Sequence, residues 1–115
     1  MLESISLRRM WQRLTGFKAP AEGELAGVTV GGKSLVVAQW NGRLYALDDR
    51  CPHDARVRLS SAGWLGNGKI FCRLHGADVS VETGCSYNFP AIRTYPIDIR
   101  SDGIFLRLEN TENPA

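Results

Sequence analysis

The sequence predicts an all-β protein, an antiparallel β-sandwich or small barrel preceded by a short N-terminal helix. Two observations support this fold class. From residue 24 onward, short segments read as strands, and several alternate apolar with polar residues. Turn signals separate these segments at short intervals, at Gly31-Gly32, Asn41-Gly42, Thr83-Gly84 and Asp102-Gly103. A chain of 115 residues is long enough for one domain with a modest core and too short for two.

The N-terminal segment predicts the helix. Apolar residues recur there at three- and four-residue spacing, at Leu7, Met10, Trp11 and Leu14. This spacing is typical of an amphipathic helix that starts near Ser4 or Ser6 and stops at Gly16. Its polar face is basic, so it either packs on the domain or docks on a partner protein or an anionic membrane surface. We assign residues 1–22 to this helix and a linker.

The strands are expected within residues 23–109, which we assign to the β domain. Segments 25–30 and 33–40 are joined by Gly31-Gly32. Asn41-Gly42 predicts a tight type I′ hairpin turn, because both residues readily take positive φ angles. Further strand-like segments follow, at 44–47, 69–71, 77–82, 95–99 and 104–108. Turns are expected at 60–63 and 66–68, and residues 110–115 are expected to form a frayed tail.

Composition excludes several classes of protein. The net charge of +2 gives no case for nucleic-acid binding. No run approaches the roughly 18 apolar residues of a membrane span, and arginines interrupt the N-terminus where a secretory signal would need a continuous apolar segment. Three cysteines cannot all pair, so a disulfide framework is not expected and a cytoplasmic location is the default.

Two loops concentrate the residues that can bind metal. They are Cys51-Pro52-His53 and Cys72-Arg73-Leu74-His75, and they hold four of the five cysteines and histidines in the chain. Thiolate and imidazole are ligands for zinc or iron. Two cysteines and two histidines formally provide the four ligands of a zinc site, although zinc modules usually place ligands of the same kind close together in the sequence. One Cys and one His in each loop suit an asymmetric two-metal centre, in which one iron takes both sulfurs and the other both imidazoles.

Because of these two loops, residues 48–91 resemble a Rieske-type ferredoxin, the [2Fe-2S] electron carrier of bacterial ring-hydroxylating oxygenase systems. A Thr83-Gly84 turn and a Pro90-Ala91 pair follow the loops, and the strands from residue 23 onward are similar to the base domain of that family. The resemblance implies a Rieske-like sandwich or barrel with a small cluster-binding subdomain at about 48–91. It also implies a [2Fe-2S] cluster as the cofactor.

The resemblance also implies a role for each residue of the site. Cys51 and Cys72 would bind the buried iron, and His53 and His75 the outer iron. Pro52 would stiffen the first loop, Gly76 would let the backbone approach the cluster, and Pro90 would lie on a third loop covering it. Backbone N–H groups directed at the sulfurs would help to set the potential. Cys85 is read as a third-loop residue near the cluster and not as a ligand.

The chain departs from one branch of the family. High-potential Rieske proteins of respiratory chains carry an extra cysteine in each loop, joined as a disulfide, and neither loop has one here. The resemblance therefore favours the low-potential, ferredoxin-like branch. Arg56, Arg58 and Arg73 place positive charge near the histidines. They are either solvated loop charges or a complement to an acidic docking surface.

The histidine count decides the expected function. Oxygenases with a Rieske domain also need a mononuclear iron held by two histidines and a carboxylate, but both histidines are already used. With no candidate nucleophile beside a base, the chain is expected to be an electron carrier and not an enzyme. The implied partners are a flavin-dependent NAD(P)H reductase and a terminal oxygenase of aromatic-compound metabolism, with the carrier a monomer. The alternatives are a small Rieske subunit of a nitrite reductase-like complex and a non-redox zinc-binding interaction module.

Overall fold

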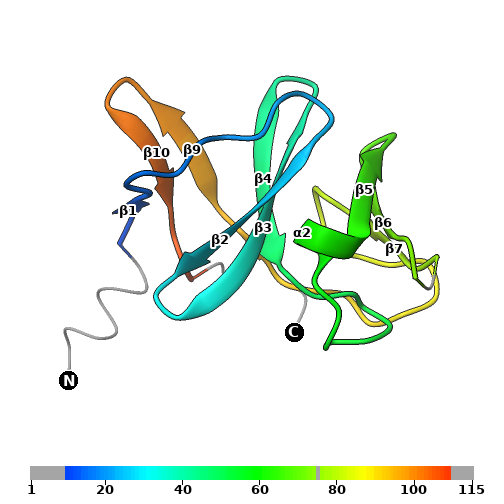
Figure 1. The fold of residues 1–115 in the computed structure, drawn as a ribbon. Helices are drawn as coiled ribbons and strands as arrows, with labels where there is room; N and C mark the ends of the chain where they lie inside the picture. The colour runs from blue at the N-terminus through cyan, green and yellow to red at the C-terminus, as the bar shows by residue number, and fades with distance from the viewer. Residues whose placement is uncertain (1–9, 75, 110–115) are drawn as a thin grey trace.

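A computed structural model describes residues 10–74 and 76–109 (Figure 1). Within them the chain forms ten strands and one short helix. In chain order these are β1 (Gln12–Arg13), β2 (Leu25–Val30), β3 (Lys33–Trp40), β4 (Arg43–Asp48), α2 (Leu59–Ala62), β5 (Gly63–Gly66), β6 (Lys69–Cys72), β7 (Asp78–Ser80), β8 (Thr94–Tyr95), β9 (Ile97–Arg100) and β10 (Gly103–Leu106). The predicted tail at 110–115 lies outside the described residues.

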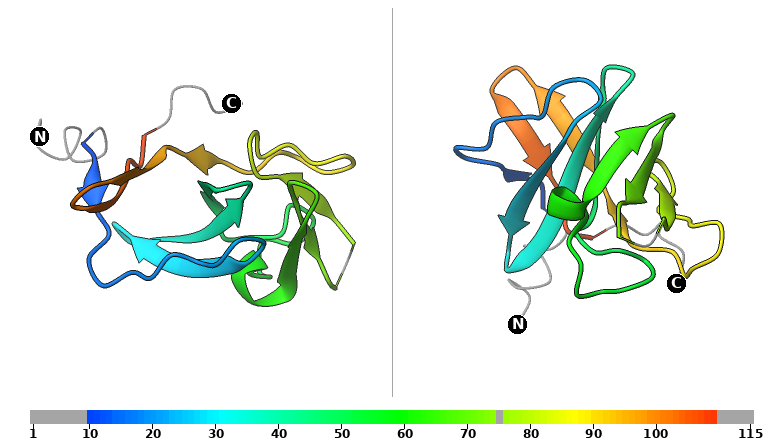
Figure 2. Two further views of the ribbon diagram at one scale, coloured as in Figure 1. Left: turned by 90° about the horizontal axis from the view of Figure 1, so that it is seen from above. Right: turned by 45° about the vertical axis from the view of Figure 1, so that its right-hand side comes forward.

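The strands form three small sheets, and every pairing between them is antiparallel. The base sheet has the order β2-β3-β4-β8, a second sheet the order β1-β10-β9, and a third the order β5-β6-β7. The base sheet lies between the other two, as the views in Figures 1 and 2 agree. The predicted all-β antiparallel fold is confirmed.

Strand β3 is buried on both faces of the base sheet. Leu35, Val36, Val37 and Ala38 are all fully inaccessible to solvent. Successive side chains of a strand point to opposite faces, so the four residues divide between two cores. A continuous apolar run of this kind is what a strand covered on both sides requires.

The two cores have different members. The base core lies between the base sheet and β1-β10-β9 and comprises Leu14, Val30, Leu35, Val37, Leu44, Ala46, Tyr95, Leu106 and Leu108. The loop-side core lies between the base sheet and β5-β6-β7. It comprises Val36, Ala38, Leu47, Cys51, Leu59, Ile70, Cys72, Ala77, Val79, Val81 and Ile92. Two of the predicted metal-ligating residues are therefore part of a hydrophobic core.

The predicted hairpin at Asn41-Gly42 is confirmed. Asn41 and Gly42 have φ angles of 53° and 77°, and Trp40 pairs with Arg43 across the turn. Two consecutive positive φ angles match the right-handed twist of the flanking strands. This turn fixes the pairing of β3 with β4, and β4 leads directly into the first metal-binding loop.

The turn predicted at residues 60–63 is instead largely a single helical turn, α2 (Leu59–Ala62). A buried carboxylate lies beneath it. Asp49 accepts hydrogen bonds from the Ser60 amide at 2.7 Å and from the Ser60 hydroxyl at 2.5 Å. Buried carboxylates require such partners, so this contact anchors α2 to the end of β4.

The predicted N-terminal helix is wrong where the structure describes it. Its first half lies outside the described residues, but Gln12–Arg13 is strand β1 and pairs with β10. Trp11 lies beside the guanidinium groups of Arg100 and Arg107, 4.9 and 5.2 Å from the ring centroid. Leu14 is buried in the base core. Of the described residues whose spacing predicted a helix, Leu14 is thus buried and Trp11 half-buried beside a strand, while Met10 is exposed.

None of the described residues belongs to a helix long and apolar enough to span a membrane.

Candidate metal centre

Two loops of similar construction carry the predicted metal ligands. The first follows β4, and the Cys51 amide donates to the Val57 carbonyl at 2.8 Å. The second follows β6, and the Cys72 amide donates to the Ala77 carbonyl at 2.9 Å. Each loop has a second internal bond, from Val57 to Asp54 and from Gly76 to Cys72. Both loops are therefore closed by their own backbones at the cysteine.

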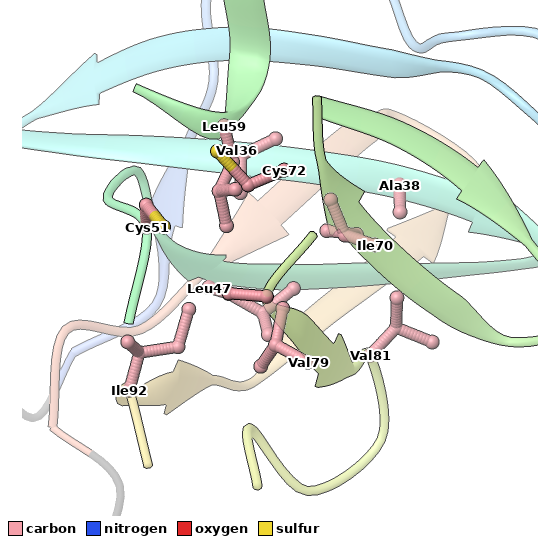
Figure 3. Close-up of a cluster of buried hydrophobic side chains, with 11 residues drawn as sticks. Val36, Ala38, Leu47, Cys51, Leu59, Ile70, Cys72, Val79, Val81 and Ile92 are labelled. Carbon is pink, nitrogen blue, oxygen red and sulfur yellow. The ribbon is translucent and has the colours of Figure 1, made fainter. Parts of the chain in front are cut away.

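The two cysteines lie together in the loop-side core (Figure 3). Cys51 is fully inaccessible and Cys72 nearly so, and neither is in a disulfide. Burial raises the pKa of the Cys51 thiol, and the neighbouring Cys72 side chain acts in the same direction. Backbone amides of Asp54 and His53 donate to the Cys51 sulfur and oppose this rise in pKa. They would stabilise the thiolate that metal binding requires.

His53 lies on the outer side of the first loop and is exposed to solvent. Its ring is 4.9 Å from that of Phe89, measured between centroids, at an interplanar angle of 59°. The structure thus brings the third loop, which carries Phe89 and the exposed Pro90, to the first loop. His75 lies outside the described residues. Gly76 has a φ angle of 70°, which explains a glycine at that position.

Asp78 fixes the third loop. Its carboxylate accepts hydrogen bonds from the Tyr87 amide at 2.9 Å and the Ser86 hydroxyl at 3.2 Å, and it forms an ion pair with Lys69 at 3.2 Å. These contacts lower the pKa of Asp78, with the Tyr87 amide as the largest cause. The position of Asp78, three residues after His75, gave no signal of this anchoring role.

The base of the third loop depends on a close backbone approach. The Ile92 amide donates to the Gly84 carbonyl at 2.9 Å, and a Cβ at Gly84 would lie 2.1 Å from the Ile92 carbonyl oxygen. Glycine is therefore required at the predicted Thr83-Gly84 turn. Cys85, the next residue, is exposed, whereas Cys51 and Cys72 are buried. Cys85 therefore differs from Cys51 and Cys72 in its exposure to solvent.

The donor set fits an asymmetric centre. Two thiols lie together inside the core, and an imidazole lies outside on the same loop as one of them. Among residues 10–74 and 76–109, no three His, Cys, Asp or Glu side chains gather closely enough to hold a single ion. Sulfur ligands inside and imidazole outside match the arrangement of a [2Fe-2S] centre in which two histidines replace two cysteines on one iron.

The fold and this pair of loops define a small antiparallel β domain that carries a metal centre at one end. Residues 10–101 match the family model described as the Rieske [2Fe-2S] domain. The chain belongs to this family, and its cofactor is a Rieske-type [2Fe-2S] cluster.

Curated relatives agree with this assignment. The chain is 36% identical over 91 residues to the ferredoxin component of the naphthalene 1,2-dioxygenase/salicylate 5-hydroxylase systems of Ralstonia sp., covering 76% of this chain and 86% of the relative. It is 38% identical over 90 residues to the ferredoxin component of the naphthalene 1,2-dioxygenase system of Pseudomonas aeruginosa, covering 76% and 85%.

Solved structures share the fold. The ferredoxin of carbazole 1,9a-dioxygenase from Nocardioides aromaticivorans IC177 has a TM-score of 0.70 at 21% identity, covering 86% of this chain and 95% of that one. A chain from the reduced complex between oxygenase and ferredoxin in carbazole 1,9a-dioxygenase has a TM-score of 0.81 at 26% identity. That match covers 95% of this chain and 31% of the other.

Proposed function

We propose that this chain is the ferredoxin component of an oxygenase system for aromatic compounds. It takes single electrons from a flavin-dependent NAD(P)H reductase and passes them to a terminal oxygenase. The observation that carries the proposal is the similarity to dioxygenase ferredoxin components over 85–86% of their lengths. Proteins of that size and name are carriers, so the chain supplies no catalytic residues of its own. A cytoplasmic location and a monomeric state are part of the proposal.

The proposed ligands are Cys51 and Cys72 for the inner iron and His53 and His75 for the outer iron. Burial of both thiols together and exposure of His53 support this division. The cluster accepts and releases one electron. The residues around it hold the thiolates in the core, direct the amides of His53 and Asp54 at one sulfur, and leave an imidazole at the surface for contact with a partner.

The proposed domain division is residues 1–22 as an N-terminal segment, 23–109 as the β domain with the cluster part at about 48–91, and 110–115 as a tail. The proposed potential lies in the lower part of the roughly −150 to +300 mV range of Rieske centres, since neither loop has an extra cysteine. A redox titration with a midpoint near the top of that range would contradict the low-potential assignment.

Reconstitution tests the function. The holoprotein is mixed with the reductase and oxygenase of a naphthalene 1,2-dioxygenase system, NADH and substrate, in place of the native ferredoxin. We expect product that depends on this chain and a reduced-state electron paramagnetic resonance signal of Rieske type. The matched control is Cys72→Ser, which should support no turnover. A holoprotein that the reductase does not reduce, or that yields no product, would refute the proposal.

A further inference from the structure

A basic groove lies against the first metal-binding loop. It encloses about 550 Å³ and is lined by the turn between β2 and β3 with the start of β3, by the end of β4 with the two residues after it, and by Ala55, Arg56 and Arg58. Ala55 and His53 are two residues apart, so their Cα atoms lie within about 8 Å of each other. The groove therefore includes a residue of the same loop that carries the exposed His53.

Cations outnumber carboxylates in this groove, with Lys33, Arg50, Arg56 and Arg58 against Asp48 and Asp49. Both carboxylates are also bonded elsewhere. Asp49 is 7% exposed and accepts two hydrogen bonds from Ser60. Asp48 accepts a hydrogen bond from the Tyr95 hydroxyl at 2.6 Å and also forms an ion pair with Arg50 of the groove at 3.6 Å. The groove therefore keeps a net positive charge, to which Arg50 contributes less because Asp48 lies beside it.

Two of the cations are held in place by side-chain hydrogen bonds. Arg58 donates to the Ser34 hydroxyl at 2.9 Å, across to β3. Arg56 donates twice to Asp54 at 3.1 Å, and this carboxylate raises the pKa of the guanidinium. Guanidinium groups fixed before binding lose less conformational freedom when a carboxylate arrives. The larger groove on the molecule, about 980 Å³, is instead balanced, with Arg43 and Arg107 against Glu82 and Asp98.

We propose that the basic groove is a docking site for a carboxylate-rich surface of the protein that exchanges electrons with the cluster. The proposal rests on the carrier function proposed above. We assign the groove to a protein surface and not to a free phosphate because a carrier must meet a protein at the end that holds its cluster, and the phosphate alternative is tested below. Complementary charge on and next to the loop that carries His53 raises the rate of encounter and orients the partner toward that end of the molecule.

The test compares two double variants: one reverses two charges in the groove, and the other reverses two charges outside it. Lys33→Glu/Arg58→Glu changes two groove cations that lie outside the segment from Cys51 to Val57. The matched control, Lys18→Glu/Arg43→Glu, makes the same change in net charge at exposed positions outside the groove. Arg43 and Asp48 begin and end β4, so the two ends lie roughly 17 Å apart. Visible spectra of both variants establish that the cluster is retained.

The first measurement needs no protein partner. The reduced cluster is oxidised by ferricyanide or by hexaammineruthenium(III), each of which accepts one electron, and the rate is followed in a stopped-flow instrument. At low ionic strength the groove variant should react about tenfold more slowly with the anion and faster with the cation, and salt should remove both effects. The control variant should change less than about threefold. Equal responses of the two variants, or none, would overturn the proposal.

The second measurement uses the oxygenase that supports turnover with the wild-type chain. The groove variant should raise the half-saturating concentration of this chain about tenfold at low salt, and the control should not. If inorganic phosphate binds the wild type and not the groove variant while half-saturation is unchanged, the groove is a small-anion site and the proposal fails. Absence of turnover with the wild type would instead refute the carrier function, and the oxidation rates would still test the groove.

Discussion

The base core and the loop-side core share strand β3 but differ in composition. The base core is built from aliphatic side chains and Tyr95, whose hydroxyl donates to Asp48. The loop-side core is aliphatic too, but it contains the two buried cysteines. The comparison shows that one strand separates a region that contributes only stability from a region that contributes both stability and chemistry. Substitutions on opposite faces of β3 should therefore have separable effects.

The largest expected effect comes from the cysteines of the loop-side core. Cys51→Ser or Cys72→Ser should abolish binding of the cluster, because a serine hydroxyl is a poor ligand for an iron–sulfur centre. Iron analysis and the visible spectrum measure the loss. Cys85→Ser is the matched control and should retain full iron content, since Cys85 is exposed. Loss of iron from the Cys85 variant would mean that the third loop contributes a ligand.

Neighbouring valines of β3 provide the sharpest comparison of the two cores. Val36 and Val37 are both fully buried and face the loop-side core and the base core respectively. Each change to alanine should lower the free energy of unfolding by about 1–3 kcal/mol, through lost burial and the cavity left behind. Only Val36→Ala should also speed loss of the cluster on warming, followed by visible absorbance. Equal rates of cluster loss would show that the two cores are not separable.

The smallest effect concerns acid stability at the third loop. The folded-state pKa of Asp78 is lowered, so its stabilising contribution is complete above the unfolded value of about 3.9 and is lost as pH falls through the folded value. Asp78→Asn should cost about 1 kcal/mol at neutral pH, and this difference from wild type should shrink below about pH 4. Urea unfolding from pH 3 to 7 measures it. Asp102→Asn, in the exposed turn between β9 and β10, should show no such dependence.

Sequence reasoning succeeded where the determining interactions are local. Asn41-Gly42 specifies its own turn, and one Cys and one His in each loop suit an iron–sulfur centre, which the resemblance to the Rieske family then implies. It failed where residues distant in the sequence determine the local structure. Leu14 and Trp11 have helical spacing, but the two residues between them pair with β10, and Trp11 packs against two arginines from the far end of the chain.

Two anchors of the loops were also beyond sequence reasoning. Asp49 accepts two hydrogen bonds from Ser60, eleven residues away. This contact stabilises the helical turn α2 at a position where the sequence predicts only a turn. Asp78 has an ion pair with Lys69 and a hydrogen bond from the Tyr87 amide, nine residues away on either side. The residues next to either aspartate give no indication of which backbone amide its carboxylate will accept a hydrogen bond from.

If Cys51 and Cys72 bind the cluster as proposed, the closed backbones of their two loops bear on the speed of electron exchange. The Cys51 and Cys72 amides are bonded within their own loops, and the side chains of both residues are packed in the loop-side core. Ligands held in this way can move little when the charge of the centre changes by one electron. A small displacement of the ligands means a small reorganisation energy, so the activation barrier to transfer stays low for a given driving force.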